Sequence, residues 1–145
     1  MGPFAEERQN LFTPSEFACG CGCQTSGMAL EFMERLFRAR QEAGIPFVVT
    51  SGRRCPGHNA AVGGAPGSAH LTGHAADIAC RTSAARHAIL RALFLAGFPR
   101  IGIGAGFIHA QCRPGDEPGL AWLYPESGRK TPRNPGVCLT GGTGR

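Results

Sequence analysis

One histidine and one aspartate stand at a spacing that suits metal chemistry. His70 and Asp77 lie seven residues apart in Ser68-Ala-His-Leu-Thr-Gly-His-Ala-Ala-Asp77, and Gly73 between them permits a sharp turn into a strand. Imidazole nitrogens and carboxylate oxygens are good zinc ligands, and a catalytic zinc ion normally takes three protein ligands plus water. The best candidate for the third ligand is His109, which lies in a short predicted strand of the C-terminal half.

The other histidines and Ser68 are weaker candidates for a role in catalysis or metal binding. A regular strand would point His74 away from Asp77, which favours a structural or surface role. His58 belongs to a long loop, where it either lines a cleft or is solvated, and His87 is expected on a helix surface. A Ser-His-Asp hydrolase is a poor alternative because Ser68 does not lie in a G-x-S-x-G turn.

The seven cysteines are unevenly placed. Three of them form the segment FACGCGC, and the rest are scattered: Cys19, Cys21 and Cys23, then Cys55, Cys80, Cys112 and Cys138. The C-x-C-x-C spacing differs from the C-x2-C spacing of most structural zinc sites. Three interpretations stay open: a glycine-rich turn with reduced thiols, a disulfide from this turn to Cys55, or a second metal site.

Composition excludes several classes of protein. The chain has 15 basic and 10 acidic residues, and its net charge of +5 is compatible with anionic partners. Its fourteen arginines are dispersed, and no nucleic-acid-binding motif accompanies them, so we expect no nucleic-acid partner. No apolar run approaches the roughly 20 residues that span a bilayer, and the N-terminus lacks the pattern of a secretory signal. We expect a monomer without a membrane partner.

The elements that position the candidate ligands follow from periodicity and capping. Helices are expected over residues 28–43, ending at Gly44, and 82–96, capped by Thr82, with Ala85, Leu90, Leu93 and Phe94 on the buried side of the second. Strands are expected over residues 45–50, 73–80, 100–104 and 107–112. Residues 51–69 read as a long loop without regular structure.

Two helices packed on a small, mainly antiparallel sheet make an α+β domain. We expect this domain to span residues 1–125 and a Pro/Gly-rich tail, partly disordered, to span residues 126–145.

Three segments together resemble a known family. The pattern Ser-x-His-x-x-Gly-x-Ala-x-Asp over residues 68–77, followed by a strand histidine, resembles the zinc D-alanyl-D-alanine carboxypeptidases, whose fold is shared with the Hedgehog signalling domain. Residues 50–55 resemble the family's Ser-Gly-Tyr-Arg segment, with Arg53 in place of tyrosine and Arg54 matching the arginine. Residues 100–109 resemble its closing strands. The similarity extends from about Phe12 to Tyr124.

The resemblance implies an activity and a set of roles. His70, Asp77 and His109 would bind one catalytic zinc ion, and the substrate would be a peptidoglycan stem peptide, cut at a bond that the motifs do not specify. Arg54 would bind the terminal carboxylate or a carbonyl oxygen of that peptide. Small relatives without a leader resemble phage or prophage lysis enzymes, which stay in the cytoplasm until they are released or delivered to the cell wall.

Two further positions have alternative roles. Ser68 would contact substrate or a neighbouring ligand, or only begin the turn. Trp122, with Tyr124, would line the substrate cleft or pack the tail onto the core.

One position departs from the family's pattern. Relatives often carry His-x-Asp or His-x-His at the last ligand, whereas this chain has Gln111, which can orient water but cannot accept a proton at neutral pH. We consider Asp116 or Glu117 as the replacement base, against the simpler reading of a solvated pair. The alternative function is a zinc-binding cell-wall-binding or structural module that has lost efficient catalysis.

Overall fold

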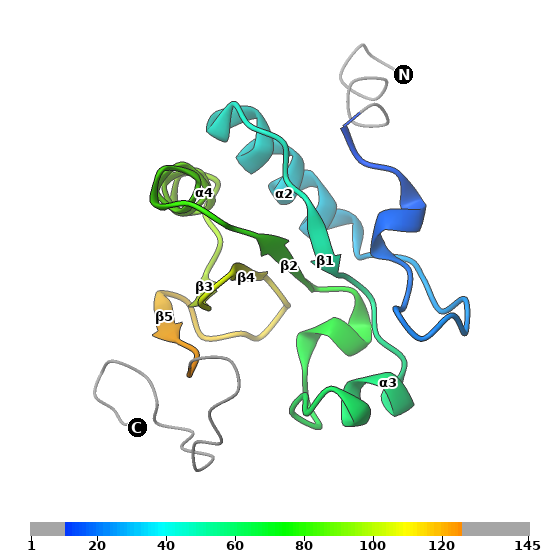
Figure 1. The fold of residues 1–145 in the computed structure, drawn as a ribbon. Helices are drawn as coiled ribbons and strands as arrows, with labels where there is room; N and C mark the ends of the chain where they lie inside the picture. Colours follow the sequence, from blue (N-terminus) through cyan, green and yellow to red (C-terminus); the bar gives the residue numbers. More distant parts are fainter. Residues whose placement is uncertain (1–10, 126–145) are drawn as a thin grey trace.

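The computed structural model describes residues 11–125 and is built on one five-stranded sheet (Figure 1). The strands lie in the order β1-β2-β4-β3-β5. Their bounds are β1 (Val49–Ser51), β2 (Ala75–Ala79), β3 (Arg100–Ile103), β4 (Phe107–Gln111) and β5 (Leu120–Leu123). Neighbouring strands are antiparallel, except that β5 runs parallel to β3. The expected α+β fold with a mainly antiparallel sheet is confirmed.

Two long helices, α2 (Leu30–Ala43) and α4 (Ser83–Leu95), pack against each other on the same side of the sheet (Figure 1). Gly44 ends α2 in the left-handed conformation, with φ of +69°, and the Thr82 hydroxyl accepts the N–H of Ala85 at 3.0 Å to cap α4. Both boundaries agree with the sequence-based expectation. The core between helices and sheet contains Phe32, Leu36, Ile89, Leu93, Ile78, Ile101 and Ile108.

The face of the sheet opposite these helices carries the polar residues. Side chains alternate along a strand, so the core residues Ala76 and Ile78 put the intervening Asp77 on the other face. Residues paired directly across the five strands then form one row, namely Ser51, Asp77, His109, Gly102 and Trp122. Strand pairing therefore sets a carboxylate beside an imidazole.

Several sequence-based boundaries were wrong. Residues 51–69 are not without regular structure, because they contain helix α3 (Pro56–Ala61) and begin the 3-10 helix η2 (Ala69–Thr72). The predicted strand over residues 45–50 begins only at Val49, after the buried Phe47. Strand β5 was not predicted at all.

One predicted core residue of α4 was also wrong. Phe94 is 59% exposed, because the helix buries Ile89, Ala92 and Leu93, and this stripe turns Phe94 toward solvent.

The N-terminal arm, from Phe12 to Phe17, packs against the rest of the domain. Phe12 and Phe17 are buried in edge-to-face contact, and Phe17 closes the 3-10 helix η1 (Pro14–Phe17). The backbone of Arg53 donates to the carbonyl of Phe17 at 2.8 Å, which joins the arm to the segment after β1. Within residues 11–125 no helix is long and apolar enough to cross a membrane. The predicted tail, residues 126–145, lies outside the described residues.

Candidate metal centre

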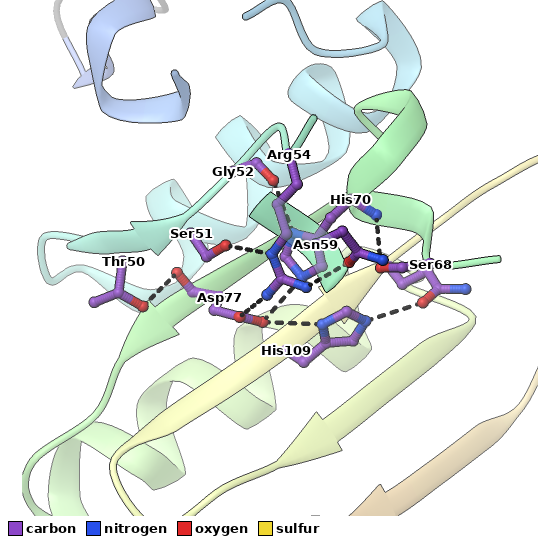
Figure 2. A network of polar contacts seen from close by, with 10 residues as sticks. Thr50, Ser51, Gly52, Arg54, Asn59, Ser68, His70, Asp77 and His109 are labelled. Atoms are coloured by element: carbon purple, nitrogen blue, oxygen red, sulfur yellow. Dashed lines mark hydrogen bonds and ion pairs between the residues drawn. The ribbon is translucent and has the colours of Figure 1, made fainter. Parts of the chain in front are cut away.

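Three potential ligands meet on the polar face of the sheet (Figure 2). Asp77 comes from β2, His109 from the neighbouring β4, and His70 from η2. One ligand atom from each lies within 4.8 Å of the other two. The Oδ1 atom of Asp77 is 2.9 Å from Nδ1 of His109 and 3.4 Å from Nε2 of His70. The structure thus brings together the three residues that the sequence singled out.

His70 is held by its turn and by the carbonyl of Gly52. The Ser68 hydroxyl accepts the His70 backbone N–H at 3.2 Å, and the turn closes at Gly73, whose φ of +76° suits glycine. The His70 Nδ1 atom lies 2.7 Å from the Gly52 carbonyl oxygen, which can only accept a hydrogen bond. Nδ1 therefore carries a proton, which leaves Nε2, the nitrogen facing Asp77, to bind a metal ion. This tautomer is the one that a metal-binding histidine needs.

His109 has the opposite tautomer, set by a chain of polar contacts. Its Nε2 atom lies 2.9 Å from Oε1 of Gln111, and the Gln111 amide donates to Asp116 at 2.8 Å. The Asp116 carboxylate accepts only, so it fixes the amide with its oxygen toward His109. His109 must then donate from Nε2, which leaves Nδ1, the nitrogen facing Asp77, to bind a metal ion. Arg113 contacts the other Asp116 oxygen through two nitrogens, each at 3.2 Å.

Asp77 is half-buried between Arg54 and the two histidines. Burial alone would raise the pKa of its carboxyl, but the hydrogen bonds and charge that His109 and His70 supply when their nitrogens facing Asp77 are protonated hold that pKa well below its usual range. The Nη2 atom of Arg54 lies 3.3 Å from the second carboxylate oxygen, Oδ2. Asp77 is consequently an anion at neutral pH, as a metal ligand must be.

Arg54 is fixed by three acceptors. Its Nε atom donates to the Ser51 hydroxyl at 3.0 Å, Nη1 donates to Asn59 at 3.2 Å, and Nη2 donates to Asp77 at 3.3 Å (Figure 2). A guanidinium has five N–H donors. Among the described residues these three contacts leave one N–H on each Nη nitrogen for another acceptor.

An aromatic wall flanks His109. The ring centroid of Trp122 lies 5.6 Å from that of His109, and the centroid of Tyr124 lies 6.2 Å from it. Gly102 makes this possible, because an added Cβ would stand 2.5 Å from the Tyr124 ring and 2.8 Å from that of Trp122. Burial raises the pKa of Tyr124 to about 12, and the nearby Asp77 charge adds to this rise.

The remaining predicted residues lie outside the His70-Asp77-His109 group. Asp116 has only 5% of its side chain exposed and reaches His109 through Gln111, whereas Glu117 is exposed. His74 contacts Thr72 at 2.8 Å, lies 3.9 Å from Glu31 and is not part of the His70-Asp77-His109 group.

Sequence reasoning missed the Gly52 carbonyl, Asn59 and Arg113. The carbonyl of Gly52 acts on His70 in a distant segment, which residue types and spacing do not reveal, whereas Arg113 contacts Asp116 only three residues further along the chain. Asn59 lies on α3, a helix that the sequence did not predict, and contacts Arg54 from there.

The donor set fits zinc. Two neutral imidazoles and one carboxylate are a common set for a catalytic zinc ion, which keeps a fourth position for water or substrate. Ligand bonds of about 2.0–2.1 Å would place tetrahedral ligand atoms about 3.3 Å apart. The 2.9 Å and 3.4 Å separations from Asp77 bracket this value.

Comparison with known proteins agrees with this geometry. The family model described as Peptidase M15 matches residues 10–111, which is more than half of the chain and includes His70, Asp77 and His109. No curated protein matches the chain. Peptidase M15 comprises zinc-dependent D-Ala-D-Ala carboxypeptidase-like enzymes. The extent of the match shows that this chain belongs to the Peptidase M15 family.

Proposed function

We propose that the protein is a zinc peptidase that hydrolyses peptide bonds in the stem peptides of bacterial peptidoglycan. His70, Asp77 and His109 would hold the ion. The observation that carries this proposal is the pair of histidine tautomers. Nδ1 of His70 lies 2.7 Å from the Gly52 carbonyl oxygen, and Nε2 of His109 lies 2.9 Å from Oε1 of Gln111. The other ring nitrogen of each histidine therefore faces Asp77. Its setting would be that of small wall-degrading enzymes of phages and prophages, which act after release or delivery.

Each neighbouring side chain then has a defined task. Bound zinc supplies Lewis acidity, which polarises a peptide carbonyl and makes water a nucleophile near neutral pH. Arg54 offers its two remaining N–H groups to the substrate's terminal carboxylate or to a carbonyl oxygen. Trp122 forms an apolar wall for the peptide beside His109. Ser68 supports the turn that carries His70.

Gln111 and Asp116 act by positioning in this proposal. Gln111 fixes the His109 tautomer, and Asp116 fixes Gln111. Both Asp116 oxygens already have partners, which argues for positioning rather than proton transfer. The hypothesis that Asp116 or Glu117 serves as general base stays a prediction, and single alanine variants of the two residues test it.

A second candidate function is a zinc-stabilised wall-binding module without efficient catalysis. The observation that favours it is that Gln111, which cannot accept a proton at neutral pH, occupies the place beside His109. Under this alternative the aromatic wall and Arg54 would bind wall peptide and release it unchanged.

Digestion of purified peptidoglycan distinguishes the two functions. We expect the zinc-loaded protein to release amino acids or peptides, identified by mass spectrometry, and Asp77→Ala to release none. His87→Ala is the matched control, because His87 is exposed on α4. Co-sedimentation with peptidoglycan and no released product, from walls with several stem-peptide types, would favour the binding module instead.

A further inference from the structure

Four cysteines from two distant segments converge outside the proposed centre. Cys19, Cys21 and Cys23 lie in the turn after η1, and Cys55 immediately precedes α3. Their four Sγ atoms all lie within 4.8 Å of one another. None of these residues belongs to the His70-Asp77-His109 group, so the cluster has no part in the function proposed above.

The sulfur separations match a tetrahedral thiolate site. The Sγ atoms of Cys19 and Cys21 are 3.5 Å apart, and the Sγ atom of Cys55 is 3.7 Å from each of them. Four sulfurs at the Zn–S distance of about 2.3 Å occupy tetrahedron corners about 3.8 Å apart. The three sulfurs thus form one near-equilateral face, and Cys23 lies close enough to supply the fourth corner.

The backbone holds the sulfurs in this arrangement. The Cys19 N–H donates to the carbonyl of Thr25 at 2.8 Å, which closes the turn. The Cys55 N–H points at the Cys19 sulfur at 3.4 Å, and the His58 N–H points at the Cys55 sulfur at 3.3 Å. N–H donors aimed at sulfur favour thiolate, the form of cysteine that binds metal.

We propose that Cys19, Cys21, Cys23 and Cys55 bind a structural zinc ion. Four thiolates fill a tetrahedral coordination sphere and leave no open position, so this ion would hold structure rather than react. The ion would fasten the N-terminal turn to the residue that directly follows Arg54. It would add to the hydrogen bond between Arg53 and Phe17 in fixing the segment that presents Arg54 to Asp77.

X-ray absorption at the zinc edge tests this proposal directly. In Asp77→Ala, which removes the proposed catalytic ligand, we expect the zinc that remains to show sulfur scattering at about 2.3 Å from four sulfur atoms. Only nitrogen or oxygen scattering, or no zinc at all in this variant, would overturn the site. A measurement on the unmutated protein decides the same point if the variant does not fold, because the His/Asp centre contributes no sulfur.

Metal counting gives an independent test. We expect Cys21→Ser/Cys23→Ser to hold one zinc ion per chain fewer than the unmutated protein. Cys112→Ala is the matched control, because Cys112 is buried and stands outside the cluster, and it should keep the full content. Equal zinc content in the double variant would contradict the proposal. So would a disulfide between Cys55 and Cys19 or Cys21, found by mass spectrometry of the alkylated, unreduced protein.

Discussion

Gly52 is the position where backbone packing and the proposed metal centre depend on each other. A Cβ added there would stand 2.6 Å from Cα of Phe17 and 2.8 Å from its carbonyl oxygen, and these are backbone atoms that cannot rotate away. Gly52→Ala must therefore displace the segment that follows β1 from the N-terminal arm. The carbonyl that fixes the His70 tautomer belongs to the same residue and must move with it.

The expected magnitude has two parts. Overpacking of this kind costs about 1–3 kcal/mol of unfolding free energy, which should appear even in metal-free protein. Losing the partner that orients a metal-binding histidine lowers metal affinity by about 10- to 100-fold. Each tenfold loss removes about 1.4 kcal/mol of zinc-linked stabilisation, so the zinc-loaded variant should be destabilised by about 2–6 kcal/mol in all.

Urea unfolding with and without excess chelator separates the two parts, and competition with a chromogenic chelator gives the zinc affinity. Gly57→Ala is the matched control, because no atom lies within 4 Å of a Cβ added there. We expect its unfolding free energy to stay within about 0.5 kcal/mol of the unmutated protein and its zinc affinity to be unchanged. A Gly52→Ala protein with unmutated stability and zinc affinity would refute the reasoning.

Three further predictions address the residues around the centre. Asp116→Ala should lower zinc affinity about tenfold, because Gln111 loses the partner that orients it. Glu117→Ala should change neither zinc affinity nor turnover. Lost turnover in Glu117→Ala would identify Glu117 as the general base. Arg54→Lys should lower kcat/KM by about 10- to 100-fold, mainly through KM, on peptides with a free carboxylate, and an unchanged KM would contradict its binding role. Tyr124, the single tyrosine, should ionise near its raised pKa of about 12 in an absorbance titration. Because the unfolded chain loses this proton at lower pH than the folded protein, the free energy of unfolding should fall between about pH 10 and 12. A titration midpoint near pH 10 would contradict the argument that burial raises this pKa.

The parts of this molecule that were predictable are those encoded locally. The α2 and α4 helices carry an apolar stripe, and residue types at their ends mark the boundaries. His70 and Asp77 belong to one short segment, and a strand histidine was the natural third partner. Their convergence needed only antiparallel pairing of β2 with β4, which sets Asp77 opposite His109.

The parts that were missed are short elements and contacts that residue types and spacing do not indicate. Helix α3 has only six residues, begins with Pro-Gly and lies in a Gly/Ala/Pro-rich stretch, so composition concealed it. Strand β5 has four residues and is defined by parallel pairing with β3. The residue pattern within β5 does not indicate this pairing. The function of Gln111 follows from Asp116 folding back onto it, which the spacing of the two residues does not dictate.

The most direct test of the account is the zinc content per chain of the unmutated protein and of His109→Ala, measured side by side after dialysis. His109 reaches Asp77 at 2.9 Å and has no contact with the cysteine cluster among the described residues, so its loss should affect one centre alone. We predict one zinc ion per chain fewer in His109→Ala and no loss in the control His87→Ala. Equal zinc content in His109→Ala and the unmutated protein would contradict the proposed metal centre.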